Sequence, residues 1–282
     1  MFCDYHVHTE YSDDSVYKMK DVVNDGISRG LKEICFTDHV DYGVKRDWDD
    51  PRGIDYRKDE SGEPLANVDY EKYYREFLQL AEEYKDKINL KLGLEFGMQR
   101  HTVVDFEKLF KRYPFDCILL SVHQINDMEF WTGDYQKGKT QKEYNLEYYE
   151  ELLYLVKHYH NYSTLAHLDL ITRYDPEGTI SFEVIKPVIT EILKTAIADG
   201  KGIEFNTSWH RYGLIDTTPS REILKLYKEL GGEIITIGSD SHKPEHLGAY
   251  VEETHQILRE LGFTRFCTYD KMKPIYHELG EE

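Results

Sequence analysis

The stretch Asp4-Tyr5-His6-Val7-His8-Thr9 constrains the fold of this chain more than any other. Side chains alternate between the two faces of an extended strand, so His6 and His8 point to the same side and can grip one metal ion. Alone, a His-x-His pair is a weak signal, because an ordinary surface or core pair has the same pattern. Five later segments that read as apolar strands also present His, Asp or Glu at or just beyond their ends. This recurrence indicates a metal centre.

The later ligand candidates share this position relative to their strands. They are Asp38-His39 after Glu33–Thr37, Glu95 in Leu90–Phe96, His123 closing Cys117–His123, His167 with Asp169 at the end of Thr164–Leu168, and Asp240 with His242 after Glu233–Ser239. If these strands are parallel and adjacent, the side chains gather at one mouth. Buried unpaired charge is costly, and metal cations are its natural compensation. So many ligands exceed the needs of one ion and predict two or three.

Strand and helix patterns alternate along the chain, which is typical of parallel α/β architecture. The predicted strands are Phe2–His8, Gly202–Asn206 and the five segments above. Apolar residues at helical spacing predict helices over Val16–Arg29, Tyr70–Tyr84, Val104–Arg112, Lys142–His158, Phe182–Asp199 and Arg221–Leu230. Without a linker or an internal repeat, residues 1–282 are predicted to form one barrel domain.

Two polar stretches, Asp41–Asp69 and Asn126–Thr140, are too long for simple barrel connections. Long loops after strands at the catalytic end of a barrel commonly form substrate walls or lids, although decorative surface loops have the same composition. A third loop, leaving the first predicted strand, carries Asp13 and Asp14. Such a loop can fold a carboxylate back over the site.

Composition excludes several classes of function. The 53 acidic and 35 basic residues give a net charge of −18, which argues against a nucleic-acid-binding surface. The four cysteines have no CxxC spacing, so we interpret them as small core residues of a reducing compartment. No apolar run is long enough to span a membrane, and ligand candidates from His6 onward leave no room for a cleaved signal peptide. We expect a cytoplasmic protein.

The motifs together resemble the PHP (polymerase and histidinol phosphatase) family over nearly the whole chain. They are His6-x-His8-Thr9, Thr37-Asp38-His39, Glu95, Ser121-x-His123, His167-Leu168-Asp169 and Asp240-x-His242. Within the family, the stretches 167–174 and 204–208 are most similar to the histidinol-phosphate phosphatases. The resemblance implies a distorted (β/α)7 TIM-like barrel of the PHP type, with a trinuclear metal centre.

The resemblance also implies a distribution of the ligands. One metal would take His6, His8, Glu95 and Asp240, and Glu95 would bridge to a second metal held by His123 and His167. The third would take Asp14, His39 and His242, although many family members have a histidine in place of Asp14, and the neighbouring Asp13 is an alternative. Zinc, manganese and iron all accept such ligands, so the identity of the ions stays open.

The resemblance implies a metal-dependent phosphomonoesterase, and the chemistry agrees, because two neighbouring metals can share a hydroxide that attacks phosphorus. Arg173 and Arg211 lie in loops leaving predicted strands and are the candidate phosphate ligands. Asp240 is a candidate acceptor of the nucleophile's proton. His242 or, less favoured, His210 is a candidate proton donor to the leaving group, while Gln99, Arg100 and His101 follow Glu95 closely enough to reach the mouth.

The resemblance implies a small-molecule substrate, L-histidinol phosphate, in histidine biosynthesis, with no nucleic acid or membrane partner. The alternatives are a phosphoesterase acting on a nucleotide or another small phosphoester, and a non-catalytic metal-binding module. The oligomeric state is left open by the sequence.

Overall fold

The computed structural model describes residues 1–56 and 64–280, in which seven parallel strands form the sheet that carries the candidate site. In spatial order they are β1 (Cys3–Val7), β2 (Glu33–Phe36), β6 (Asn89–Gly97), β7 (Cys117–Ser121), β10 (Thr164–Leu165), β11 (Gly202–Asn206) and β12 (Ile235–Gly238). The short β3 (His39–Val40) pairs with the end of β6, beside Glu95. Every pair in this sheet is parallel.

The sheet curls until its first and last strands meet. Just beyond the end of β12, the amide of His8 donates to the carbonyl of Ser241 (2.8 Å), and the amide of Ser241 donates to the carbonyl of His6 (3.1 Å). Val7 and Ser241 thereby form a parallel bridge. The predicted distorted (β/α)7 barrel is confirmed.

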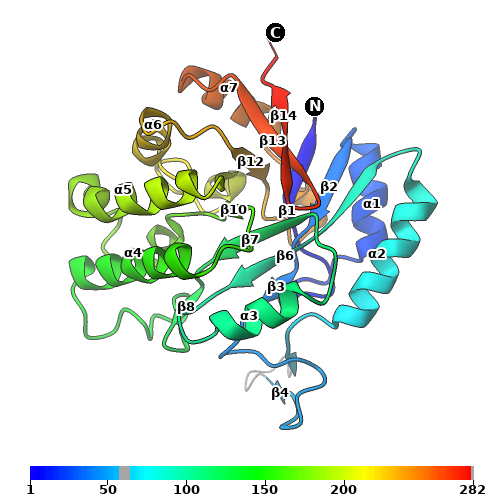
Figure 1. Ribbon diagram of the computed structural model, residues 1–282, viewed down its shortest axis with the longest axis horizontal. Helices are drawn as coiled ribbons and strands as arrows, with labels where there is room; N and C mark the ends of the chain where they lie inside the picture. Colours follow the sequence, from blue (N-terminus) through cyan, green and yellow to red (C-terminus); the bar gives the residue numbers. More distant parts are fainter. Residues whose placement is uncertain (57–63, 281–282) are drawn as a thin grey trace.

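Helices surround the strands on the outside of the barrel (Figure 1). They are α1 (Met19–Ser28), α2 (Tyr70–Tyr84), α3 (Val103–Phe110), α4 (Gln141–His158), α5 (Phe182–Ala198), α6 (Arg221–Glu229) and α7 (Val251–Glu260). The Asp69 side chain caps α2, and Thr140 with Glu143 forms a reciprocal capping box at the start of α4, which satisfies amides that have no partner within the helix. The six predicted helices are confirmed, whereas α7 was missed.

The strands are buried on both faces because each has helices on one side and the barrel interior on the other. In β6, every residue after Asn89 is buried. All four cysteines are buried and free, as predicted for core residues. No helix of the described residues is both long and apolar enough to cross a bilayer.

Three predicted strands were too long by two or more residues at one end: Cys117–His123 ends at Ser121, Glu233–Ser239 shortens to Ile235–Gly238, and Thr164–Leu168 keeps only its first two residues. The prediction of Thr164–Leu168 is wrong beyond Leu165, where β10 ends and the chain turns sharply, with His167 at φ 23°. A 3₁₀ turn over Leu170–Tyr174 follows. Ala166 and Leu168, which suggested a longer strand, are buried in the bend before this 3₁₀ turn.

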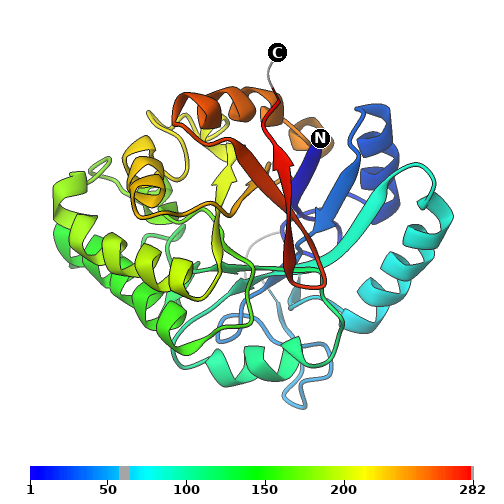
Figure 2. The ribbon, with the colours of Figure 1, turned by 45° about the horizontal axis from the view of Figure 1, so that its top comes forward.

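An antiparallel hairpin, β13 (Arg265–Asp270) and β14 (Lys273–Glu278), was not predicted. It packs beside β12 and reaches the amino ends of the strands, seen in red near the start of β1 (Figure 2). Lys91 binds Asp270 (2.8 Å), and the amide of Met272 donates to the carbonyl of Asp116 (2.9 Å). The hairpin therefore covers the end of the barrel away from the predicted ligands.

Both long polar stretches contain short hairpins. The first holds β4 (Asp55–Tyr56) and β5 (Pro64–Leu65), and part of it, 57–63, lies outside the described residues. The second begins beside β8 (Gln124–Ile125), which pairs with β9 (Met128–Glu129). Residues from both stretches line a cavity at the carboxyl ends of the strands.

Candidate metal centre

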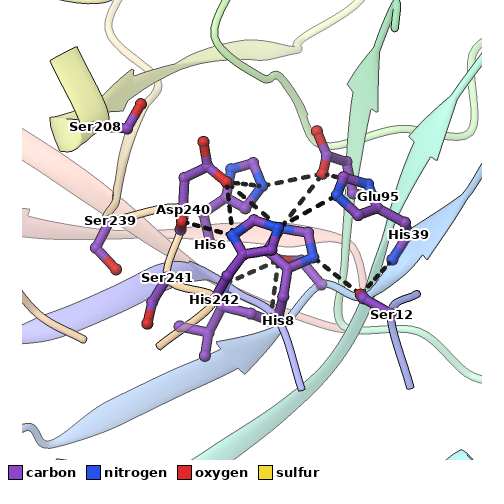
Figure 3. Close-up of polar contacts among 12 residues, drawn as sticks. His6, His8, Ser12, His39, Glu95, Ser208, Ser239, Asp240, Ser241 and His242 are labelled. Atoms are coloured by element: carbon purple, nitrogen blue, oxygen red, sulfur yellow. Dashed lines mark hydrogen bonds and ion pairs between the residues drawn. The ribbon is translucent and has the colours of Figure 1, made fainter. Parts of the chain in front are cut away.

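Glu95, near the end of β6, lies at the middle of the candidate site and is fully buried. Its two carboxylate oxygens face different groups of histidines, and Figure 3 shows it opposite His6, His8 and His39. The structure brings all nine predicted ligands into one cluster around this carboxylate. They form three sets of donor atoms.

The first set combines Glu95 Oε2 with the two histidines of β1 and its exit. His6 Nε2 lies 3.1 Å and His8 Nε2 3.5 Å from this oxygen. Asp240 Oδ1 lies 3.8 Å from His6 Nε2 and 3.6 Å from His8 Nε2. Four donors from three strand ends thus converge on one point.

The second set uses the other oxygen of the same carboxylate. Glu95 Oε1 lies 3.1 Å from His123 Nε2 and 2.7 Å from His167 Nε2. Because one carboxylate faces both sets, Glu95 has the position of a bridging ligand.

The third set lies nearer the surface. Asp14 Oδ2 is 3.6 Å from His39 Nε2 and 3.2 Å from His242 Nε2, and the two imidazole nitrogens are 3.5 Å apart. The neighbouring Asp13 binds Lys45 Nζ at 2.6 Å instead. Of the two carboxylates in this loop, the structure therefore places Asp14 with the histidines.

These separations fit bound metal ions. Nitrogen and oxygen ligands about 2.1 Å from one zinc ion lie roughly 3–4 Å from one another, and most of the donor separations above fall in this range. The buried Nε2 of His8 has no hydrogen-bond partner among the described residues, although it points at these oxygens. A buried nitrogen without a partner is costly, and a cation at this point would satisfy it.

The outer nitrogens of several histidines bind groups that orient the rings. His6 Nδ1 donates to Glu204 (2.6 Å) and His123 Nδ1 donates to Asp41 (2.7 Å). His8 Nδ1 lies 3.1 Å from Ser12 Oγ. These contacts leave the Nε2 atoms facing the cluster, as ligation requires.

The histidines and the carboxylates stabilise one another's charges. Burial alone would raise the pKa of Glu95, but the surrounding imidazoles, His6 and His123 foremost, hold it well below its usual range. Burial lowers the pKa of His123, but Glu95 and Asp41 outweigh it and raise this pKa to about 9. Despite burial, neighbouring carboxylates also raise the pKa of His6 and of His39, whereas burial lowers the pKa of His8 and of His167. Without metal, protons on His6, His39 and His123 therefore compensate the buried carboxylates.

Two ligand candidates have an unusual backbone conformation. His167 has φ 23° and Asp240 has φ 55°, a region that residues other than glycine rarely adopt. Such strain persists only where the surrounding structure enforces it, and it clusters at functional sites. Here it turns both side chains back over the mouth of the barrel.

Arg173 and Arg211 both reach Asp240. Arg173 Nη2 donates to Ser208 Oγ (2.7 Å) and lies 3.3 Å from Asp240 Oδ2. Arg211 donates to the carbonyls of Ser239 (2.6 Å) and Asp240 (2.5 Å), and its Nη2 also lies 3.3 Å from Asp240 Oδ2. The two guanidinium groups therefore stand beside the first donor set.

Both arginines line a cavity of about 490 Å³ that also reaches ligand candidates from all three sets. His246, which was not among the predicted site residues, lines it too. His210 is outside this lining and stacks between Trp209 and Tyr250. Gln99 contacts Asp127, at the rim, rather than the donor sets.

Arg100 and His101, the other two residues after Glu95, also lie away from the donor sets. Arg100 pairs with Glu151 on α4, and His101 lies 3.1 Å from Asp127. Neither is among the residues that line the cavity.

Sequence reasoning missed the residues whose side chains hold the candidate ligands in place. Glu204 is a fully buried carboxylate inside the apolar strand β11, and an acid in such a run is a signal of a buried partner. Asp41 and Lys45 begin the long loop after β3 and carry no such signal. Asp38, a ligand candidate by its place after β2, instead accepts hydrogen bonds from Thr9 and Ser12 and so fixes the loop after β1.

The chain is similar to several curated proteins over most of its length. It is 31% identical to the histidinol-phosphatase of Lactococcus lactis over 277 residues, which cover 96% of this chain and 95% of that protein. It is 30% identical to a probable histidinol-phosphatase of Clostridium acetobutylicum, covering 88% and 89% of the two chains.

Solved structures agree with this similarity. The crystal structure of the Lactococcus lactis histidinol phosphate phosphatase, a complex with zinc, L-histidinol and phosphate, superposes with a TM-score of 0.83 at 30% identity, covering 97% of this chain and 98% of that one. A putative histidinol phosphatase from Listeria monocytogenes shares the fold, with a TM-score of 0.68 at 18% identity over 88% and 98% of the two chains. The PHP domain matches residues 4–208. From its sequence and its fold alike, this chain belongs to the PHP domain family.

Proposed function

We propose that this protein is a metal-dependent phosphatase that hydrolyses L-histidinol phosphate to L-histidinol and phosphate. The observation that carries the proposal is the convergence of three donor sets and two arginines on one cavity. The 31% identity over 96% of the chain to a histidinol-phosphatase supports the choice of substrate.

Three divalent ions would fit the three donor sets, with Glu95 shared between the first and the second. His6, His8 and Asp240 would complete the first set, and His123 and His167 the second. Asp14, His39 and His242 would hold the third. The chemistry that divalent ions supply at such a site is a water of lowered pKa and neutralisation of charge on the phosphate oxygens.

Arg173 and Arg211 would bind the phosphate oxygens that the metal centre leaves free. Guanidinium groups suit this task because their planar N–H groups match phosphate oxygens. In the structure both share Asp240 as a partner, which keeps them poised at the cavity.

Asp240 would act mainly as a ligand. Burial raises its pKa, but His6, Arg211 and Arg173 outweigh burial and hold it well below the usual range, so its carboxylate keeps a proton poorly. This weakens the role of proton acceptor expected from the sequence. His242 lines the cavity, but as a ligand of the third ion its ring would be neutral, so it would give a proton to the leaving alcohol only where the third site is empty.

The direct test is phosphate release from histidinol phosphate compared with a panel of mononucleotides and an aryl phosphate. The protein would have known metal content and be assayed with and without chelator. We expect kcat/KM for histidinol phosphate to exceed the panel by orders of magnitude and to vanish with the metal. Preference for a nucleotide would overturn the substrate and favour the alternative phosphoesterase.

We also propose that the enzyme works in the cytoplasm, on a small molecule and without nucleic acid. The four free, buried thiols suit a reducing compartment. The net charge of −18 disfavours a polyanionic partner.

A further inference from the structure

Tyr212 contacts both arginines of the cavity. Arg173 Cζ lies 3.9 Å and Arg211 Cζ 5.2 Å from the centroid of its ring. The three side chains come from two loops, because Arg173 follows β10 whereas Arg211 and Tyr212 follow β11. All three line the cavity. The ring therefore joins the two loops at the place where the arginines stand beside the first donor set.

The backbone fixes the place of this ring. Ser208 lies in the 3₁₀ turn Thr207–His210, and its carbonyl accepts from the amides of Arg211 (3.0 Å) and Tyr212 (3.1 Å). The hydroxyl of the same serine accepts from Arg173 Nη2 (2.7 Å). One residue thus holds both the backbone of Tyr212 and the arginine side chain that the ring covers.

The two guanidinium groups carry like charges and share one counter-ion. The Nη2 atoms of both lie 3.3 Å from Asp240 Oδ2, while Asp240 Oδ1 faces His6 and His8. A cation at the first donor set would draw on the charge of Asp240 and leave less of it to hold the arginines. The face of an aromatic ring attracts a guanidinium group without neutralising it. Tyr212 can therefore hold the arginines in place and leave their charge for a phosphate.

Arg173 is the arginine on which the ring acts more strongly. Its side chain is 8% exposed, against 19% for Arg211, and an aromatic ring binds a cation more tightly where water is excluded. The buried Nε of Arg173 has no hydrogen-bond partner in the part of the chain that the structure describes. The orientation of this guanidinium group therefore draws on the ring of Tyr212 as well as on Ser208 and Asp240.

We propose that Tyr212 is a positioning residue for phosphate binding, whose ring face holds the guanidinium groups of Arg173 and Arg211 ready for phosphate oxygens. The ring acts and the hydroxyl does not, since the hydroxyl has no hydrogen bond within residues 1–56 and 64–280. This inference rests on the proposed function for the binding of phosphate at the two arginines, and deepens it. It is independent of which alcohol carries the phosphate.

The test measures the binding of inorganic phosphate to the metal-loaded protein by calorimetry, together with KM for histidinol phosphate and for a neutral alkyl phosphate. We expect Tyr212→Leu to raise all three constants about tenfold, the size of one lost cation–π contact with a desolvated guanidinium group. Tyr212→Phe keeps the ring and should retain phosphate binding. Tyr250→Leu is the matched control, because Tyr250 is 49% exposed, against 47% for Tyr212, and stacks on His210 (3.8 Å) instead of an arginine.

A double variant shows whether the ring acts through Arg173. Arg173→Met removes the group that the ring holds most closely, so Tyr212→Leu should weaken phosphate binding by less than about twofold in that background. An additive loss would mean that Tyr212 contacts the ligand directly, and it overturns the proposal. Unchanged phosphate binding in Tyr212→Leu, or an equal loss in Tyr212→Phe, overturns it too. If the wild type binds phosphate but does not prefer histidinol phosphate, the proposed substrate fails and this inference is still decided by the phosphate constants.

Discussion

Buried polar groups at the two ends of the barrel differ in whether they have hydrogen-bond partners. At the amino end, the hydroxyl of Tyr5 donates to Glu33 and accepts from the amide of Tyr269 (2.7 Å), while the hydroxyl of Tyr269 donates to the carbonyl of Ser163 (3.0 Å). At the carboxyl end, the buried Nε2 of His8 and Nδ1 of His167 have no hydrogen-bond partner in the described part of the chain. The Tyr5–Glu33–Tyr269 contacts at the amino end serve stability, whereas these ring nitrogens of His8 and His167 at the carboxyl end are free to bind a ligand.

The largest expected effect lies at the carboxyl end. Glu95→Gln removes the charge shared by two donor sets, so we expect kcat/KM to fall by at least about a thousandfold and bound metal to be lost. Metal content and phosphate release measure the two losses, with the exposed Glu150→Gln as the control. Full metal content with full activity would contradict the assignment of Glu95 as the shared ligand.

A smaller effect is expected beside the metal centre. Arg173→Met removes a candidate phosphate ligand but none of the predicted metal ligands, so KM should rise roughly 10- to 100-fold while metal content stays near that of the wild type. Arg75→Met, an exposed arginine on α2, is the matched control. Unchanged kinetics would remove Arg173 from the site.

At the amino end we expect a substitution to lower stability and to leave the kinetics unchanged. Tyr5→Phe leaves the buried Glu33 and the Tyr269 amide without their partner, which should lower the free energy of unfolding by about 1–3 kcal/mol. Denaturant unfolding measures this loss, and kcat/KM of the folded variant should match the wild type. Tyr276→Phe, on the exposed strand β14, should change neither the free energy of unfolding nor kcat/KM. A large fall in kcat/KM for folded Tyr5→Phe would break the division between the two ends.

The smallest effect is a release of protons when metal binds. In the metal-free protein His123, with its pKa raised to about 9, carries a proton below that pH, and ligation requires the neutral ring. The stabilisation from this raised pKa is full below about pH 6.5 and is lost as the pH rises through about 9.

Zinc added to weakly buffered metal-free protein at pH 7.5 should therefore release roughly one to three protons, read with a pH indicator. Release should decline as the starting pH rises through about 9. Tyr5→Phe is the control from the opposite end and should release as many protons as the wild type. Release that is independent of pH would contradict the proton-compensated cluster.

The sequence predicted the elements whose signals are local. The bounds of β11 and α2 match the predicted Gly202–Asn206 and Tyr70–Tyr84, since each has a clear apolar pattern between turn or cap residues. The nine candidate ligands could be picked out because parallel strands place their carboxyl ends together. Their roles in binding metal stay predictions.

The features that the sequence did not predict depend on contacts between distant parts of the chain. Glu204 meets His6 across 198 positions, and Asp41 meets His123 across 82. The β13–β14 hairpin takes its place from Asp116 and Tyr5, and most of β14 is exposed, so it lacks the alternation that marks a half-buried strand. Glu129 is one of many charged loop residues until the hairpin turns it into the cavity.

The closure of the barrel, where β1 bonds to Ser241 just beyond β12, has a consequence for the synthesis of the chain. His6 and His8 emerge from the ribosome long before Ser241, which bonds to them, and before Asp240 beside them. A nascent chain that stops short of residue 235 lacks both β12 and part of two donor sets. Metal acquisition is thus expected only after β12 and the residues that follow it have been made and the barrel has closed.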